Sequence, residues 1–184
     1  MVLGAVLWTA HVEVPAGGVQ PARVEPVAQE EQPNEPIQCL IVTGHQHPAH
    51  VWRDTTAALQ EALALDKRMQ VTVVPDPEFL ATGQLANFDV MVLNYCNWQR
   101  PGLSDAAKEN FIKFLNDGGG LALVHFSNGA FHASLPETPP SDWPEYRNIC
   151  RRVWDHAAGR SSHDPYGHFQ VDVIKDHPIT QGLN

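Results

Sequence analysis

The chain has 184 residues, a length that suits one domain with a short appendage. Hydrophobic residues make up 43% of it, which is enough for a buried core. The formal net charge is -9 at pH 7, and the 12 lysines and arginines are scattered along the chain. Binding to nucleic acid needs clustered cations, so we expect no nucleic-acid partner.

The first 36 residues differ in composition from the rest. The apolar start, MVLGAVLWTA, is shorter than the roughly 20 residues that cross a bilayer, so we expect no membrane span. Residues 11–36 are rich in Pro, Glu and Gln, which predicts a disordered linker. We interpret residues 1–36 as the remnant of an export signal with this linker. An exported or periplasmic location is slightly favoured, and a cytoplasmic one is the alternative.

From residue 37 onward, patterns typical of strands and of helices alternate. Short apolar or β-branched runs predict buried strands at residues 37–44, 69–76, 88–98 and 120–126. Helical spacing of apolar residues predicts helices at residues 53–65, at 104–117 with Ser104 as the cap, and at 143–154. The alternating stretch GHFQVDVI, residues 167–174, predicts a partly exposed edge strand. This order predicts an α/β fold with a mostly parallel sheet and helices on both faces.

Ligands of such sheets bind beyond the carboxyl ends of the strands. Polar and aromatic residues gather after three of the predicted strands: His45, His47, His50, Asn94, Asn97, Trp98, His125, Ser127 and Asn128. A later loop, SSHDPYGH, adds His163, Asp164 and His168. Asn97 and Trp98 together suit a carbohydrate, whose ring can stack on an aromatic face, although a tryptophan can equally serve to bury area.

The segment HFSNG, residues 125–129, is similar to the G-x-S-x-G turn that presents a nucleophile in hydrolases. Ser127 stands at the nucleophile position, but a histidine replaces the first glycine and no base is fixed by the sequence. We therefore interpret Ser127 as a turn residue whose hydroxyl caps the following helix. His125 is either a core imidazole bonded to a carbonyl, or a general acid/base or metal ligand on a pocket floor.

The histidines make a divalent metal a candidate cofactor. His45, His125 and His163 are the candidate ligands, since imidazole nitrogen binds zinc and related ions. Their spacing matches no established zinc signature, and ordinary loop histidines are the alternative.

Several stretches together resemble the trehalose-utilisation, or ThuA-like, family: CLIVTGHQHPAHVWRDTT, FDVMVLNYCNW, GGGLALVHF and HDPYGHFQVDVIKDHPITQGL. The resemblance runs from about residue 37 to the end, and implies one domain over residues 37–184 with a flavodoxin-like sheet of the class I glutamine-amidotransferase type. Amidotransferases of that fold carry a cysteine in the turn where this chain has Ser127. The resemblance therefore does not extend to glutamine hydrolysis, and it makes His125 the first catalytic candidate.

The resemblance implies a role in carbohydrate metabolism. We expect acid/base chemistry of lyase, isomerase or hydrolase type on a disaccharide such as trehalose or its keto derivative, with His125 as the catalytic residue. The candidate substrate-binding residues are His45, Asn97, Trp98, Ser127, Asn128, His163 and Asp164. The alternative function is a non-catalytic sugar-binding or accessory domain. Because relatives usually continue past HPITQGL, we expect a domain that is truncated at its C-terminus, with an open sheet edge that favours a homo-oligomer.

Overall fold

The computed structural model describes residues 35–46, 50–97, 100–131, 142–154, 165 and 167–180. The predicted export signal and nearly all of the predicted linker lie outside these described residues. Within them, no helix is long and apolar enough to cross a membrane.

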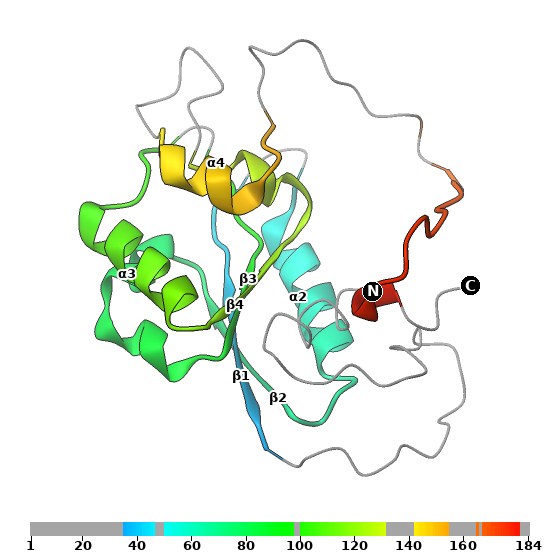
Figure 1. Cartoon of the computed structure of the whole chain (residues 1–184), viewed down its shortest axis with the longest axis horizontal. Coiled ribbons are helices and arrows are strands. Elements are labelled where there is room, and N and C mark those ends of the chain that lie inside the picture. Colours follow the sequence, from blue (N-terminus) through cyan, green and yellow to red (C-terminus); the bar gives the residue numbers. More distant parts are fainter. Residues whose placement is uncertain are drawn as a thin grey trace.

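Four strands form one parallel sheet (Figure 1). They are β1 (Ile37–Val42), β2 (Met69–Val74), β3 (Val90–Leu93) and β4 (Gly120–Leu123). Their order in the sheet is β2-β1-β3-β4, which is the order of a flavodoxin-like sheet. The predicted parallel α/β fold is confirmed. The strand predicted at residues 88–98 is shorter than expected, because the chain leaves the sheet after Leu93.

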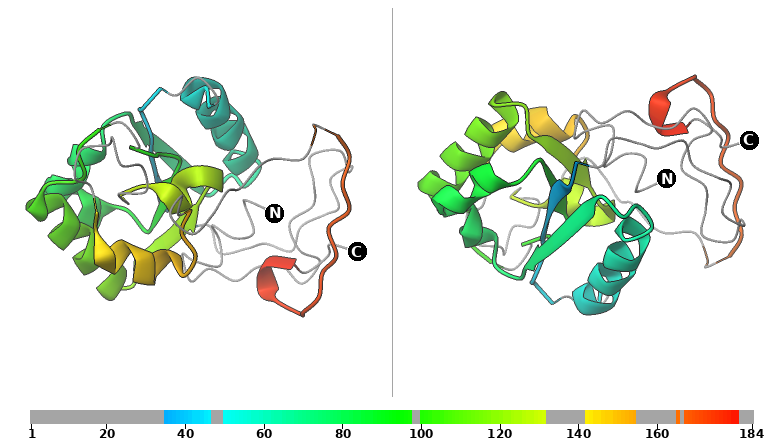
Figure 2. Two further views of the ribbon diagram at one scale, coloured as in Figure 1. Left: turned by 90° about the horizontal axis from the view of Figure 1, so that it is seen from above. Right: turned by 90° about the horizontal axis from the view of Figure 1, so that it is seen from below.

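Helices cover the two faces of the sheet. Those of the described residues are α2 (Trp52–Leu63), α3 (Asp105–Asn116), α4 (Pro144–Cys150) and the 3-10 helices η1 (Pro77–Ala81), η2 (Gly83–Asn87), η3 (His125–Gly129) and η5 (Pro178–Thr180). Figure 2 shows α2 on one side of the sheet, with α3 and α4 on the other. Ser104 caps α3 as predicted, because its Oγ accepts a hydrogen bond from the backbone N–H of Ala107 at 3.3 Å.

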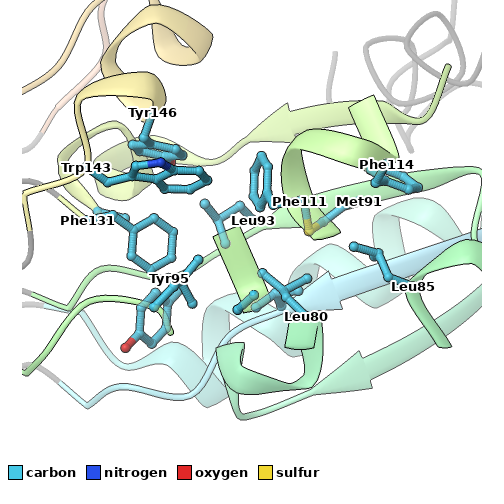
Figure 3. Packing of buried hydrophobic residues seen from close by; sticks show 14 of the residues in the cluster. Leu80, Leu85, Met91, Leu93, Tyr95, Phe111, Phe114, Phe131, Trp143 and Tyr146 are labelled. Atoms are coloured by element: carbon cyan, nitrogen blue, oxygen red, sulfur yellow. The ribbon is translucent and has the colours of Figure 1, made fainter. Parts of the chain in front are cut away.

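Two apolar clusters form the core, one on each face, because successive side chains of a strand point to opposite faces. On the α2 face, Cys39 and Ile41 of β1 pack with Leu59 and Leu63. On the α3 face, the larger cluster includes ten side chains labelled in Figure 3: Leu80, Leu85, Met91, Leu93, Tyr95, Phe111, Phe114, Phe131, Trp143 and Tyr146. Stacking of Trp143 on Tyr146, with ring centroids 5.7 Å apart, joins α4 to this cluster.

The edge strand predicted at residues 167–174 is wrong. These residues form no strand, and the apolar side chains of Phe169 and Ile174 are 85% and 96% exposed. Alternation of apolar and polar residues produces a strand only where a neighbouring strand supplies hydrogen bonds. Among the described residues, β4 is paired on one edge only, with β3, and residues 167–174 run apart from the sheet in Figures 1 and 2.

Candidate functional site

The carboxyl ends of β1, β3 and β4 meet at one edge of the sheet. Between β1 and β3 the winding changes direction, since α2 follows β1 on one face and α3 follows β3 on the other. Ligands of parallel α/β sheets bind at this kind of switch point, because the two connections diverge there and leave a crevice. The residues that follow these three strands are therefore the candidate site.

Beside the switch point lies a partly buried network of hydroxyl and amide groups. The Asn94 side-chain amide, just past β3, donates hydrogen bonds to Oγ1 of Thr55 at 3.0 Å and to Oγ1 of Thr56 at 3.1 Å. Thr56 in turn donates to Oγ1 of Thr43, just past β1, at 3.2 Å. The network fixes the first turn of α2 against two strand ends. The three threonines were not predicted from the sequence, although hydroxyl residues in the first turn of the helix after β1 were a visible signal.

Asn97 holds two loops together. Its side-chain oxygen accepts a hydrogen bond from the Phe131 N–H at 2.7 Å, and its side-chain nitrogen donates to the carbonyls of Arg100 and Pro101, both at 3.1 Å. The residue is 1% exposed. Both ends of the amide are thus used inside the protein, which makes Asn97 a support of the site. Its predicted neighbour in sugar binding, Trp98, lies outside the described residues.

Ser127 is fully buried and ties η3 to β3. Its hydroxyl donates to the Leu93 carbonyl at 2.7 Å and accepts from the Tyr95 N–H at 3.0 Å. The Tyr146 hydroxyl donates to the Ser127 carbonyl at 2.6 Å. The prediction that the Ser127 hydroxyl caps the following helix is wrong: Val124 is the N-cap of η3 and provides no side-chain bond. A hydroxyl held in this way is not presented for nucleophilic attack.

His125 is the first residue of η3, in the sharp turn that follows β4. Its backbone has φ of 48°, in the left-handed region that non-glycine residues rarely adopt. The G-x-S-x-G pattern had put the strained nucleophile position at Ser127. The left-handed backbone typical of a nucleophile elbow is instead found two residues earlier, at His125. His125 is exposed, so its interpretation as a core imidazole is wrong.

A second imidazole lies beside His125. His50 comes from the loop between β1 and α2, and its ring centroid is 5.0 Å from that of His125, with the rings at 62°. The His50 ring also stacks on Phe126, with centroids 3.8 Å apart and planes at 20°. The structure thus brings together histidines that follow two different strands. From the sequence, His50 was predicted to lie at a strand end but was not among the candidate site residues.

The other predicted site residues are placed as follows. His45 is partly buried, with both ring nitrogens shielded from solvent, and Asn128 is half-buried in η3. His163 and Asp164 lie outside the described residues. Among the residues that the structure describes, no three His, Cys, Asp or Glu side chains are grouped closely enough to hold a metal ion. Metal binding by His45, His125 and His163 stays a prediction.

Burial raises the pKa of two tyrosines behind this edge. The pKa of Tyr95 rises to about 12, and that of Tyr146 rises well above its ordinary value of 10.0, in both cases mainly because burial disfavours the charged phenolate. Burial thus favours the neutral phenol of Tyr146, the form that donates its hydrogen bond to the Ser127 carbonyl.

The fold and this edge define a parallel α/β protein with a histidine-bearing turn at the sheet's switch point. The sequence model of the ThuA family, described as trehalose utilisation, matches residues 38–184, and the chain belongs to this family. Membership connects the chain with carbohydrate metabolism. No curated protein matches the chain significantly.

Two solved structures are similar to this chain. A protein described as ThuA-like from Parabacteroides merdae ATCC 43184 is 23% identical with a TM-score of 0.50, over 63% of this chain and 38% of its own. Another protein so described, from Bacteroides uniformis ATCC 8492, is 16% identical with a TM-score of 0.48, over 68% of this chain and 46% of its own. The first match supports the fold. This chain spans less than half the length of either protein.

Proposed function

We propose that the chain acts on a disaccharide such as trehalose, or on its keto derivative, by acid/base chemistry at His125. The observation that carries the proposal is the exposed His125 imidazole on a left-handed backbone at the carboxyl end of β4. Strained backbone conformations of this kind cluster at functional sites, where the surrounding structure holds them. The ThuA family supplies the substrate class.

The chemistry suits one imidazole. The hydrogen on the carbon next to the carbonyl of a keto sugar is acidic, and an imidazole ordinarily titrates near neutral pH. His125 as a base takes this proton and leaves an enediolate. The imidazolium can return the proton to the former carbonyl carbon while the enediolate hydroxyl proton passes to the other oxygen, which isomerises the sugar. It can instead give the proton to a glycosyl oxygen that leaves the adjacent carbon, which completes an elimination.

The predicted substrate-binding residues fall into two groups, according to whether their polar atoms already form hydrogen bonds within the protein. Asn97 and Ser127 use their polar atoms to support the loops, so their contribution to substrate binding would be indirect. His45 and Asn128 stay proposed contacts, as do the residues outside the described part, Trp98, His163 and Asp164. The described residues alone do not form a metal site, and we derive no step through a metal.

The test is a proton NMR time course of keto-trehalose, and separately of trehalose, with the purified chain, with and without a divalent cation. His125→Asn is the informative variant, since Asn tolerates the left-handed backbone but cannot exchange a proton near neutral pH. We expect turnover to fall about 100-fold or more in this variant. Lys67→Ala, at an exposed residue just before β2 and so at the opposite end of the sheet, is the control and should keep full turnover.

Two results would count against the proposal. Undiminished turnover in a folded His125→Asn protein would remove His125 from the chemistry. Broadening of the sugar signals by the wild-type chain, with no new species over time, would favour the alternative of a non-catalytic sugar-binding or accessory domain.

A further inference from the structure

His50, from the loop between β1 and α2, reaches the turn after β4. Its ring meets both His125 and Phe126. His125 and Phe126 are themselves nearly perpendicular, with centroids 5.4 Å apart and planes at 82°. The three rings form a cluster in which the His50 ring stacks face to face on Phe126 and meets the His125 ring at a steep angle.

Each side of this cluster is anchored to the sheet. On the β4 side, Phe126 is buried and its neighbour Ser127 is bonded to the Leu93 carbonyl and the Tyr95 N–H. This fixes the surface on which His50 stacks. Phe126 therefore acts as a rigid floor, and the position of the His50 ring above it is set by packing.

On the other side, His50 is two residues before the first residue of α2. Asn94 bonds Thr55 and Thr56 in the first turn of that helix, so the helix start is held against β3. The Thr55 hydroxyl also bonds the Trp52 carbonyl at 3.1 Å. The chain is thus fixed a few residues after His50, by hydrogen bonds that do not involve η3.

We propose that His50 is a positioning residue for His125, which holds the exposed imidazole in one orientation toward the substrate. The inference rests on the proposed function in that His125 is the group positioned for proton transfer. An exposed side chain that moves between rotamers loses much of the rate that fixed geometry supplies. A neighbouring ring that is itself packed at its face restricts this motion without itself reacting.

The first test measures order in the His125 ring directly. Aromatic 13C relaxation of the His125 imidazole is recorded in the wild type, in His50→Ala and in His50→Phe, with the signal assigned by its loss in His125→Asn. We expect a more mobile ring in His50→Ala and an ordered one in His50→Phe, which keeps an aromatic face on Phe126. Lys67→Ala is the control and should leave the signal unchanged.

The second test measures turnover of the keto sugar. In His50→Ala we expect kcat to fall roughly 10- to 100-fold with little change in KM, because the substrate still binds while the base is misplaced. His50→Phe should recover most of kcat. A folded His50→Ala protein with wild-type kcat, or with only KM altered, would overturn the proposal.

Failure of the two proposals can be told apart. If the wild type turns over no sugar, the proposed acid/base function fails, and the relaxation data alone decide whether His50 orders His125. Equal mobility of the His125 ring in the wild type and in His50→Ala would overturn the positioning role whatever the turnover. An ordered ring in the wild type that loosens in His50→Ala would support it.

Discussion

At the scale of single residues, neighbours in one turn have opposite surroundings. His125 is exposed on a left-handed backbone, whereas Ser127, two residues later, is fully buried. The buried hydroxyl bonds backbone groups on either side of the β3 end, and so holds the turn in which His125 is presented. In this arrangement the serine supports the turn and the histidine is the group that faces solvent.

Replacing Ser127 by Ala should lower the free energy of unfolding by about 1–3 kcal/mol. The change leaves the buried Leu93 carbonyl and Tyr95 N–H without the hydroxyl between them, and an unsatisfied buried polar group is costly. Urea unfolding followed by circular dichroism measures the loss. Asn128→Ala, at the half-buried next position, is the control and should have a smaller effect; equal stability of wild type and Ser127→Ala would contradict the assignment.

At the scale of elements, β1 and β2 stay paired from Ile37 and Met69 to Val42 and Val74. The Thr43 N–H extends the pairing by bonding the Val74 carbonyl at 3.0 Å. The chain then turns at Gly44 directly against Pro75, which begins the next connection. The loop that leads to His50 therefore starts from a close backbone contact between two strand ends.

Gly44→Ala should disrupt this contact. Gly44 has φ of +129°, and an added Cβ would lie 1.9 Å from the Pro75 carbonyl oxygen. Since the obstacle is backbone, the strand ends must move apart, and we expect a loss of about 3 kcal/mol. Gly83→Ala is the matched control, because its Cβ would meet nothing within 4 Å. Equal urea midpoints for the two variants would contradict this prediction, because they would mean that the turn at residue 44 accommodates a Cβ without loss of stability.

At the scale of the whole molecule, the helices bury ionisable groups on both faces of the sheet. Tyr95 and Tyr146 belong to the larger core cluster and Cys39 to the smaller one. Burial raises the pKa of Cys39 from 9.0 to about 12 and that of Tyr95 from 10.0 to about 12, and it also raises the pKa of Tyr146 well above 10.0. All three groups therefore bind their protons more tightly in the folded than in the unfolded chain.

Stability should consequently fall at alkaline pH. A raised pKa contributes stability that is complete below the unfolded value, 9.0 for Cys39 and 10.0 for the tyrosines, and is lost as pH rises toward about 12. Urea unfolding at about pH 8 and about pH 11 measures the effect, with phenolate absorbance as a second signal. Tyr95→Phe should flatten the decline. A free energy of unfolding that is constant over this range would contradict the burial of these groups.

Much of the fold was predictable from local pattern. The apolar runs and the helical spacing identified the four strands and α2, α3 and α4, since these periods reflect which side chains a strand or helix buries. The third strand and the last helix were predicted too long, to residue 98 instead of Leu93 and to residue 154 instead of Cys150. Ser104 was predictable as a cap because its bond is made three residues away. The strand prediction for residues 167–174 was wrong because a strand needs a hydrogen-bonded partner from elsewhere in the chain.

The candidate site was predictable as an edge of the sheet but not as a set of contacts. The rule that ligands bind beyond the carboxyl ends of parallel strands selected His125, Ser127 and Asn97 together. It could not separate them, because the Ser127 hydroxyl meets a carbonyl 34 positions away, and Asn97 meets an N–H equally distant. The pairing of His50 with His125 was likewise invisible to any local pattern.

Local periodicity in the sequence was enough to predict the parallel α/β class, the presence of α2, α3 and α4 and the sheet edge on which the candidate residues lie, because these features depend on a few neighbouring residues. Which of those residues is buried as a support and which is exposed follows from the tertiary structure. That choice depends on backbone groups of β3 that fold against the turn after β4, so it exists only once distant segments have packed together.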